Sequence, residues 1–388
     1  MESDLDPAGI LMLRRAAQAF GIHQDFSPIG NGNINDTYLS EDGKYVLQRI
    51  NNAVFKDPEA LMDNIALVTK HLRKKSLLEG GDPDRCVLHF LQTAEQGCSE
   101  QADVPVNRQE NSLYNKQGSR LFTKLDGSYY RMMFFVPDTT VVDPEHCKSG
   151  ELRECGVGFG NFLRSLQDLD AGLLKETIPD FHNTAKRFEN LQKAAKEDLF
   201  GRTSCAKEEL VFAFSCKACV SRITDGLAEG SIPLCITHND TKISNILFDA
   251  KTKKARCVID LDTVMPGSRL YDYGDALRTA AASAKEDEED LTKVDVDMDA
   301  FEAFTAGFLE GMGEALTLEE RKLMPFSFFL MTYECGIRFL EDFLRGDVYF
   351  KTARPDHNLI RAKNQLTLAR KIMERQKEME AVIRRLEG

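Results

Sequence analysis

The pattern of apolar and polar positions in the first third of the chain predicts a β-meander and one helix. Segments 26–40 and 43–50 are rich in β-branched and aromatic residues, and Glu41–Gly43 between them is a turn signal. Pro58 then stands where a helix favours proline, and apolar residues follow it at helical spacing. A further β-prone run covers residues 126–136. We therefore expect the amino-terminal region to be rich in β-structure.

Beyond about residue 140 the apolar positions recur at the helical period. Two short apolar runs, 246–248 and 257–261, break this series, and both carry acidic or amide residues. The pattern predicts an α+β, bilobal fold with a cleft, made of a β-rich lobe over 1–137 and a helical lobe over 138–388. The expected helical stretches are 148–171, 183–199, 204–228, 298–316, 326–345 and 356–386.

Composition restricts the partners of the chain. It has 388 residues, 42% of them hydrophobic, and a net charge of −12, which argues against a nucleic-acid or anionic-membrane surface. The longest apolar stretch, Phe326–Tyr333, is too short to cross a bilayer, and the first thirty residues do not resemble a signal peptide. We therefore expect a cytoplasmic protein that binds neither nucleic acid nor membrane.

The ten cysteines are scattered and form neither a disulfide framework nor a zinc pattern. Only Cys216 and Cys219 make a C-x-x-C, and they lie in an apolar, helix-like run. We interpret them as buried thiols in a reducing compartment.

The segment "THNDTKISNILFD" and the later "CVIDLDT" carry the candidate chemistry. In the first, Asn245 follows Asp240 by five residues, and in the second Asp260 ends an apolar run. Magnesium prefers oxygen ligands, which Asn245 and Asp260 can supply, while Asp240 stays free to accept the proton of an attacking hydroxyl. This division of roles is the one that phosphoryl transfer from magnesium ATP requires.

A simpler interpretation exists for each residue alone, since a single loop Asp is usually a cap or turn residue. The combination H-x-D-x4-N, followed about fifteen residues later by an acid after an apolar run, favours a phosphotransferase instead. His238 is expected to be structural and to hydrogen-bond the loop backbone.

The sequences of these and other segments resemble those of the aminoglycoside phosphotransferase and choline-kinase-like superfamily, and within it those of the N-acetylhexosamine 1-kinases. The resemblance implies a protein-kinase-like bilobal fold, ATP as donor with Mg²⁺, and N-acetylglucosamine (GlcNAc) or N-acetylgalactosamine (GalNAc) as acceptor, phosphorylated at the anomeric hydroxyl. The segments that carry it are "GNINDTYL", "YVLQRIN", "IPDFHNT", "THNDTKISNILFD", "CVIDLDTVMPG", "LYDYGDALR" and "YECGIRFL".

Carried over by position, the resemblance implies that Asp240 is the catalytic base and that Asn245 and Asp260 are the magnesium ligands. It also implies that Asp272 is a buried acid that anchors the catalytic loop. The implied sugar contacts are Asp240, Asp262, Thr263, Arg338 and Tyr349.

Arg338 also has a structural interpretation. Glu334 and Asp342 lie four residues before and after it, so the three side chains could simply pair on one helix face.

The nucleotide-binding residues are less clearly marked. Gly30-Asn31-Gly32-Asn33 begins like a glycine-rich loop, although a tight hairpin turn fits it as well. Gln48 stands where a kinase would have the lysine that binds the nucleotide phosphates, and Glu59 is the candidate for its helix partner.

The acceptor remains open among several classes at this stage. The chain has no Trp, which weakens a choline cage, and its basic carboxy-terminal "VIRRLEG" does not suit a polycationic aminoglycoside. A neutral sugar fits better. The alternatives are a kinase of another small hydroxyl compound, such as an aminoglycoside, choline or homoserine, and a non-catalytic pseudokinase, which would be expected to lack one of the three motif residues.

Overall fold

The computed structural model describes residues 6–29, 34–94 and 120–388. The chain divides into two compact units. Unit 1 consists of Met1–Thr139, Gly172–Ile178 and Cys257–Val264, and unit 2 consists of Thr140–Ala171, Pro179–Arg256 and Met265–Gly388.

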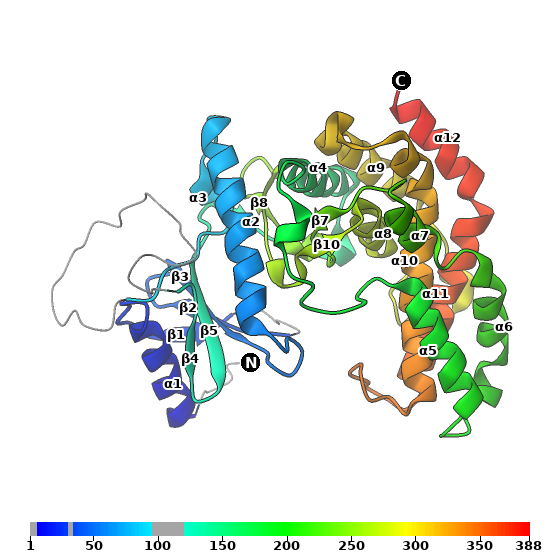
Figure 1. Cartoon of the computed structure of the whole chain (residues 1–388), viewed down its shortest axis with the longest axis horizontal. Helices are drawn as coiled ribbons and strands as arrows, with labels where there is room; N and C mark the ends of the chain where they lie inside the picture. Colours follow the sequence, from blue (N-terminus) through cyan, green and yellow to red (C-terminus); the bar gives the residue numbers. More distant parts are fainter. Residues whose placement is uncertain (1–5, 30–33, 95–119) are drawn as a thin grey trace. The chain divides into compact units, whose positions relative to one another are not determined.

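Unit 1 is built on an antiparallel sheet of five strands in the order β1-β2-β3-β5-β4 (Figure 1). The predicted meander and the strand over 126–136 are therefore confirmed. The elements of this unit are α1 (Pro7–Gln18), β1 (Phe26–Pro28), β2 (Asp36–Ser40), β3 (Tyr45–Ile50), α2 (Pro58–Leu78), α3 (Pro83–Cys86), β4 (Thr123–Leu125), β5 (Ser128–Phe134) and the 3-10 turn η6 (Leu261–Thr263).

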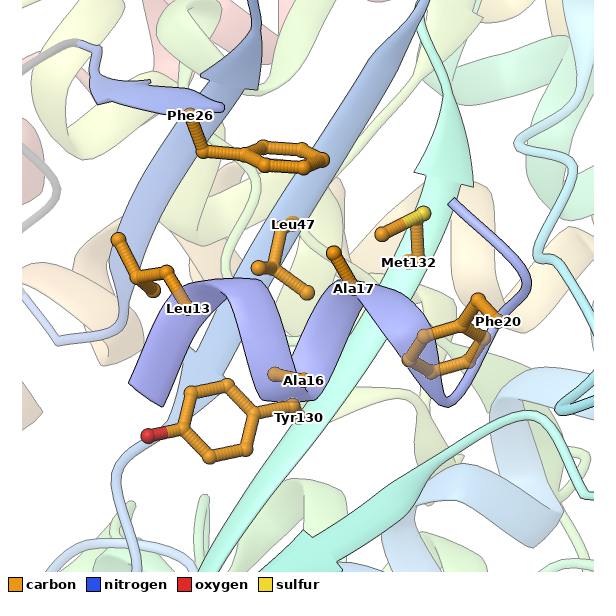
Figure 2. Packing of buried hydrophobic residues seen from close by; sticks show 8 residues of the cluster. All are labelled: Leu13, Ala16, Ala17, Phe20, Phe26, Leu47, Tyr130 and Met132. Carbon is orange, nitrogen blue, oxygen red and sulfur yellow. The ribbon is translucent and has the colours of Figure 1, made fainter. Parts of the chain in front are cut away.

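The two faces of this sheet have different roles because successive residues of a strand point to opposite sides. Leu47 on β3 and its register partner Met132 on β5 pack against α1. Burying a large apolar side chain contributes about 1.5–3 kcal/mol, so this face holds the sheet to α1. Figure 2 shows the cluster, which comprises Leu13, Ala16, Ala17, Phe20, Phe26, Leu47, Tyr130 and Met132. The next register pair, Gln48 and Arg131, lies on the opposite face.

Helix α2 begins as the sequence predicts. The Asp57 side chain accepts a hydrogen bond from the Ala60 N–H, and Pro58 occupies the first turn, where its missing N–H costs nothing.

Unit 2 is mainly helical, as predicted. Its helices are α4 (Ser149–Ser165), α5 (Thr184–Glu197), α6 (Lys207–Ser215), α7 (Arg222–Glu229), α8 (Arg269–Ala280), α9 (Met298–Met312), α10 (Leu318–Leu344), α11 (His357–Glu374) and α12 (Gln376–Leu386). Its 3-10 turns are η1 (Pro144–His146), η3 (Thr203–Ala206), η4 (Cys216–Ala218), η5 (Ile243–Asn245), η7 (Leu291–Lys293) and η8 (Gly313–Ala315), and η2 (Ala171–Leu173) lies at the division between the units.

Helices α4 and α9 approach each other very closely. A Cβ atom at Gly156 would overlap the Phe304 carbonyl oxygen, and one at Gly307 would overlap the Arg153 carbonyl oxygen. Only glycine therefore fits at these two positions.

Short strands carry the polar motifs. In unit 2, β7 (Cys235–Thr237) pairs with β10 (Met265–Gly267), and β8 (Ile246–Asp249) leads into β9 (Ala255–Val258) through a turn closed by the Asp249 N–H and the Lys254 carbonyl. The chain passes between the two units within β9 and within β6 (Thr139–Thr140). The apolar run 246–248 is thus a strand, whereas the run 257–261 is strand only over its first two residues and ends in η6.

Two predicted helices are interrupted. The stretch 204–228 breaks at η4, where the Cys219 N–H bonds to the Cys216 carbonyl in the tighter 3-10 pattern, and 356–386 breaks at Arg375. Cys216 is buried as predicted, Cys219 is half-buried, and both are free thiols. Across the described ranges, every helix is too short or too polar to cross a membrane.

Candidate active site

The loop between β7 and β8 is held by one buried acid. Asp272, on α8, accepts hydrogen bonds from the His238 and Asn239 N–H groups, both at 2.7 Å, and its carbonyl accepts one from the Thr241 hydroxyl at 2.6 Å. Burial raises the pKa of Asp272 to about 6, although these backbone donors favour the carboxylate. The predicted role of Asp272 as the anchor of this loop is confirmed.

Asp240 stands at the centre of the loop. Its Oδ2 accepts hydrogen bonds from Lys242 Nζ at 2.7 Å and from Asn245 Nδ2 at 3.1 Å. Within the described part of the chain, its Oδ1 has no hydrogen-bond partner. Burial favours the neutral acid, but the Lys242 ammonium and His238 outweigh burial and keep the pKa of Asp240 below its usual range. At neutral pH the residue is therefore a carboxylate with one oxygen available to accept a proton.

Lys242 is a site residue that the sequence reasoning missed. The motif itself held the signal, because a lysine two residues after the candidate base is close enough to pair with it.

Asn245 is buried and fixed by its amide nitrogen. Its Nδ2 donates to the Asp240 carbonyl at 2.9 Å as well as to the Asp240 carboxylate. Among the described residues, no hydrogen bond involves its amide oxygen. The side chain is thus held by its nitrogen, and its amide oxygen is the kind of atom that a hard cation binds.

His238 is structural, as expected. It is fully buried, its Nδ1 accepts from the Asp240 N–H at 3.3 Å, and its ring lies edge-on to Phe159 and Phe162 of α4.

A second histidine, which the sequence reasoning missed, supports the same loop. His182 is buried, with Nδ1 3.0 Å from Glu334 Oε1 of α10 and Nε2 3.3 Å from the Asn239 carbonyl oxygen. Burial opposes ionisation of Glu334, but His182, Arg338 and Thr184 lower its pKa. The signal for this contact was the segment "IPDFHNT", whose histidine has no partner nearby in sequence.

The second acidic motif lies in unit 1. Asp260 follows β9 and has φ 61° and ψ 57°, a left-handed conformation that is unusual for a residue other than glycine. Asp262 and Thr263 are buried in η6, which follows directly. The Asp262 carboxylate forms an ion pair with Arg131 and accepts a hydrogen bond from Asn35 at 2.5 Å.

The predicted nucleotide-binding residues of unit 1 are only partly described. Gly30, Asn31, Gly32 and Asn33 lie outside the described residues. Gln48 donates to the Thr37 hydroxyl and accepts from Arg131 Nε at 2.9 Å.

Glu59, the candidate helix partner of Gln48, has other contacts. It lies 3.4 Å from the Tyr129 hydroxyl and 3.6 Å from Arg120, and half of its side chain is exposed.

Arg338 lies on α10 among aromatic rings. Its Cζ is 5.5 Å from the ring centre of Phe350, 5.9 Å from that of Tyr349 and 6.0 Å from that of Phe181. The structural interpretation required ion pairs with Glu334 and Asp342, and the described residues show neither.

The carboxylates of Glu334 and Asp342 are engaged elsewhere. Glu334 hydrogen-bonds His182 and the Thr184 hydroxyl, and Asp342 accepts from Asn358 and the backbone N–H groups of 348, 349 and 350.

Residues 25–304 match the model of the phosphotransferase enzyme family, which covers more than half of the chain. The chain is a member of this family.

Solved structures of phosphotransferases share its fold. An aminoglycoside phosphotransferase from Alicyclobacillus acidocaldarius aligns with a TM-score of 0.56 and 12% identity, over 100% of this chain and 98% of its own. A putative aminoglycoside phosphotransferase from Ralstonia eutropha gives 0.52 and 13%, over 95% and 96%. Spectinomycin phosphotransferase, in complex with ADP and spectinomycin, gives 0.50 and 14%, over 94% and 97%. The predicted kinase-like fold is therefore confirmed.

In a phosphotransferase, a divalent cation normally accompanies the nucleotide. The donor atoms of this chain fit magnesium, since Asn245 presents an amide oxygen whose nitrogen is already fixed, and Asp260 contributes a carboxylate. The two residues belong to different units, so their joint role as ligands stays a prediction.

Proposed function

We propose that this phosphotransferase transfers the γ-phosphate of ATP to the anomeric hydroxyl of GlcNAc or GalNAc and so produces the sugar 1-phosphate. The observation that carries the kinase part of the proposal is the geometry of Asp240. Its carboxylate is held by Lys242 and Asn245, kept ionised, and left with one oxygen without a partner in the described residues.

In the proposed reaction the bond between the γ-phosphorus and its bridging oxygen breaks and ADP leaves. A new bond joins the γ-phosphorus to the sugar O1, and the hydroxyl proton passes to Asp240 Oδ1. Such general base catalysis typically contributes about 10²–10⁴-fold to the rate. Lys242 orients the carboxylate for this transfer through its 2.7 Å contact with Oδ2.

Asn245 and Asp260 would hold Mg²⁺, which when bound neutralises the charge of the nucleotide phosphates. The choice of ATP draws support from spectinomycin phosphotransferase, whose solved structure contains ADP.

The surroundings of Arg338 support a neutral acceptor. The guanidinium has no ion pair in the described residues and lies among three aromatic rings, so its donors suit the carbonyl and hydroxyl oxygens of an N-acetyl sugar. A quaternary ammonium or a polycationic aminoglycoside would meet a like charge at the same place. These contacts favour a sugar over choline or an aminoglycoside, and they leave homoserine as the alternative, since a guanidinium also suits its carboxylate.

A non-catalytic role is the opposing hypothesis. A pseudokinase would be expected to have lost part of its machinery, whereas Asp240, Asn245 and Asp260 are all present and Asp240 is ionised.

The test is a panel of acceptors assayed with ATP and magnesium, in which sugar 1-phosphate is detected directly. We expect turnover with GlcNAc or GalNAc and little with kanamycin, choline or homoserine. Turnover of another acceptor with none of the sugars would reject the acceptor assignment, and the absence of turnover with every acceptor would favour the pseudokinase.

A further inference from the structure

A buried polar network lies directly after Asp260, and its central residue Asp262, one of the expected sugar contacts, has both carboxylate oxygens bonded within the network. Asp262 and Arg131 form an ion pair with side-chain exposures of 3% each, and Asn35 Nδ2 donates to the second oxygen of Asp262. Burying two charges is costly, and replacing such a pair by apolar residues is often neutral or stabilising. Stability alone therefore gives no reason for this pair.

The network extends into the sheet through Arg131. Its Nε donates to Gln48 Oε1 at 2.9 Å, and Gln48 Nε2 donates to Thr37 at 3.0 Å, so Asp262 is tied to strands β5, β3 and β2. Gln48 is the position at which kinases carry a phosphate-binding lysine. Arg131, on the neighbouring strand β5, thus supplies the positive charge on this face of the sheet. Its acidic partner, Asp262, is two residues from Asp260.

The far end of the same turn is fixed independently. Asn64, a buried residue of α2, donates to the Val264 carbonyl at 3.0 Å and to the Lys175 carbonyl at 2.8 Å. Residues 261–264 are therefore attached both to the sheet and to α2.

These attachments fix the backbone directly after Asp260, which itself has a left-handed conformation. A non-glycine residue persists in this conformation only where its surroundings determine it, and such residues cluster at functional sites. The attachments at Asp262 and Val264 directly follow Asp260.

We propose that the Arg131–Asp262 ion pair is a positioning device that holds Asp260 in the backbone conformation needed to bind the metal–nucleotide complex. The inference rests on the proposed function for the role of Asp260 as a metal ligand. Groups that orient metal ligands typically affect metal affinity by about 10–100-fold when they are removed.

The experiment compares ADP binding by calorimetry with and without Mg²⁺ in the full chain, together with thermal unfolding. The main variant is Arg131→Met with Asp262→Leu, which removes both charges and so leaves neither one buried alone. We expect it to fold and to lose most of the gain in ADP affinity that Mg²⁺ confers, about tenfold or more. ADP affinity without Mg²⁺ is the reference, so that the gain conferred by Mg²⁺ is measured separately from any change in ADP binding itself.

The matched control is Arg14→Met with Asp25→Leu, a change of the same residue types at an exposed ion pair of the same unit. This control should keep the full effect of Mg²⁺.

A second pair of variants keeps the test decisive if the double variant does not fold. Arg131→Lys retains the charge and should preserve part of the Mg²⁺ effect, whereas Arg131→Met should not. The proposal would be overturned if all folded variants at Arg131 and Asp262 had similarly lowered melting temperatures but kept the wild-type effect of Mg²⁺ on ADP affinity.

Loss of the Mg²⁺ effect in a chain that phosphorylates no sugar would uphold the positioning role and reject only the proposed function. If the wild type phosphorylates the sugar and the variants keep the Mg²⁺ effect, the proposed function is upheld and the positioning role is rejected.

Discussion

The loop that carries Asp240 and the turn that carries Asp260 share a backbone feature but are held in different ways. Each contains a non-glycine residue in the left-handed region, Asn239 with φ 65° and Asp260 with φ 61°. The loop is held by Asp272, which accepts backbone N–H groups. The turn is held through side chains, since Asp262 pairs with Arg131 and the Val264 carbonyl accepts from Asn64.

This difference determines how each region tolerates substitution. Backbone N–H groups are present whatever the side chains of the loop are, so the contact with Asp272 does not require a particular loop side chain. The turn depends on the identity of its own side chain Asp262 as well as on that of Arg131. We therefore expect the loop to separate cleanly into an anchor and a reactive group, each of which can be changed without the other.

The largest effect is expected for the reactive group. Asp240→Asn should leave the contacts of Asp272 unchanged but remove the proton acceptor, so kcat should fall by about 10²–10⁴-fold. Binding of ATP and sugar should be almost unchanged, which calorimetry can establish alongside steady-state kinetics. A variant that keeps more than about a tenth of wild-type kcat would show that Asp240 is not the base.

The sequence predicted the loop well because its parts are local. Asp240, Asn245 and the approach of β7 lie within eleven residues, and chemical type with spacing was enough to group them in one loop, while their roles as base and metal ligand stay predictions. Even the anchor Asp272 was expected, through the family resemblance. Lys242 lies inside the motif but is not an oxygen ligand, so the metal-binding pattern gave it no role.

The turn could not be predicted in the same way. The partner of Asp262 is 131 positions away on β5, and a lone Arg in the β-prone run "SYYRMMFF" gives no sign of being buried. The alternative interpretation of Arg338 could not be decided from the sequence for a related reason. Spacing of four residues permits ion pairs, but the carboxylates of Glu334 and Asp342 hydrogen-bond partners that are distant in sequence.

The next largest effect is expected for the anchor of the loop. Asp272→Asn places an amide nitrogen against a backbone N–H, which should destabilise the chain by about 1–3 kcal/mol through an unsatisfied buried donor. Because the folded state raises the pKa of Asp272 to about 6, it binds this proton more tightly than the unfolded chain does. The stability that Asp272 contributes is therefore present near pH 4 and is lost as the pH rises through about 6.

Denaturant unfolding between pH 4.5 and 7 tests this directly. The deficit of Asp272→Asn relative to wild type should be largest at the acidic end and should shrink toward pH 7. Asp249→Asn is the control, because backbone N–H donation from Thr252 lowers the pKa of this buried acid, so its deficit should stay constant over the same range. A deficit of Asp272→Asn that grows with pH would mean that the backbone donors, rather than burial, control this group.

A smaller effect is expected at Arg338, which lies on α10 and outside both the loop and the turn. If Arg338 binds the acceptor, Arg338→Ala should lower kcat/KM for the N-acetylhexosamine by about 10–100-fold, since charge-assisted hydrogen bonds are lost. The KM for ATP should not change. A lowered melting temperature with wild-type kcat/KM would remove Arg338 from the acceptor site and leave it a residue that packs against aromatic rings.

The smallest effect is expected at Tyr349. Asp342 fixes the backbone there in the manner of Asp272, since it accepts from the N–H groups of 348, 349 and 350. The Tyr349 side chain itself is 68% exposed, so Tyr349→Phe should change stability by less than about 0.5 kcal/mol. If its hydroxyl contacts the sugar, kcat/KM should fall by about two- to tenfold, the equivalent of one neutral hydrogen bond.

Asp342→Asn should instead lower both the melting temperature and kcat/KM, because it loosens the whole segment. Tyr349→Phe could show wild-type sugar kinetics while Asp342→Asn loses kcat/KM. This result would mean that the backbone position of the segment matters and that the Tyr349 hydroxyl does not touch the acceptor.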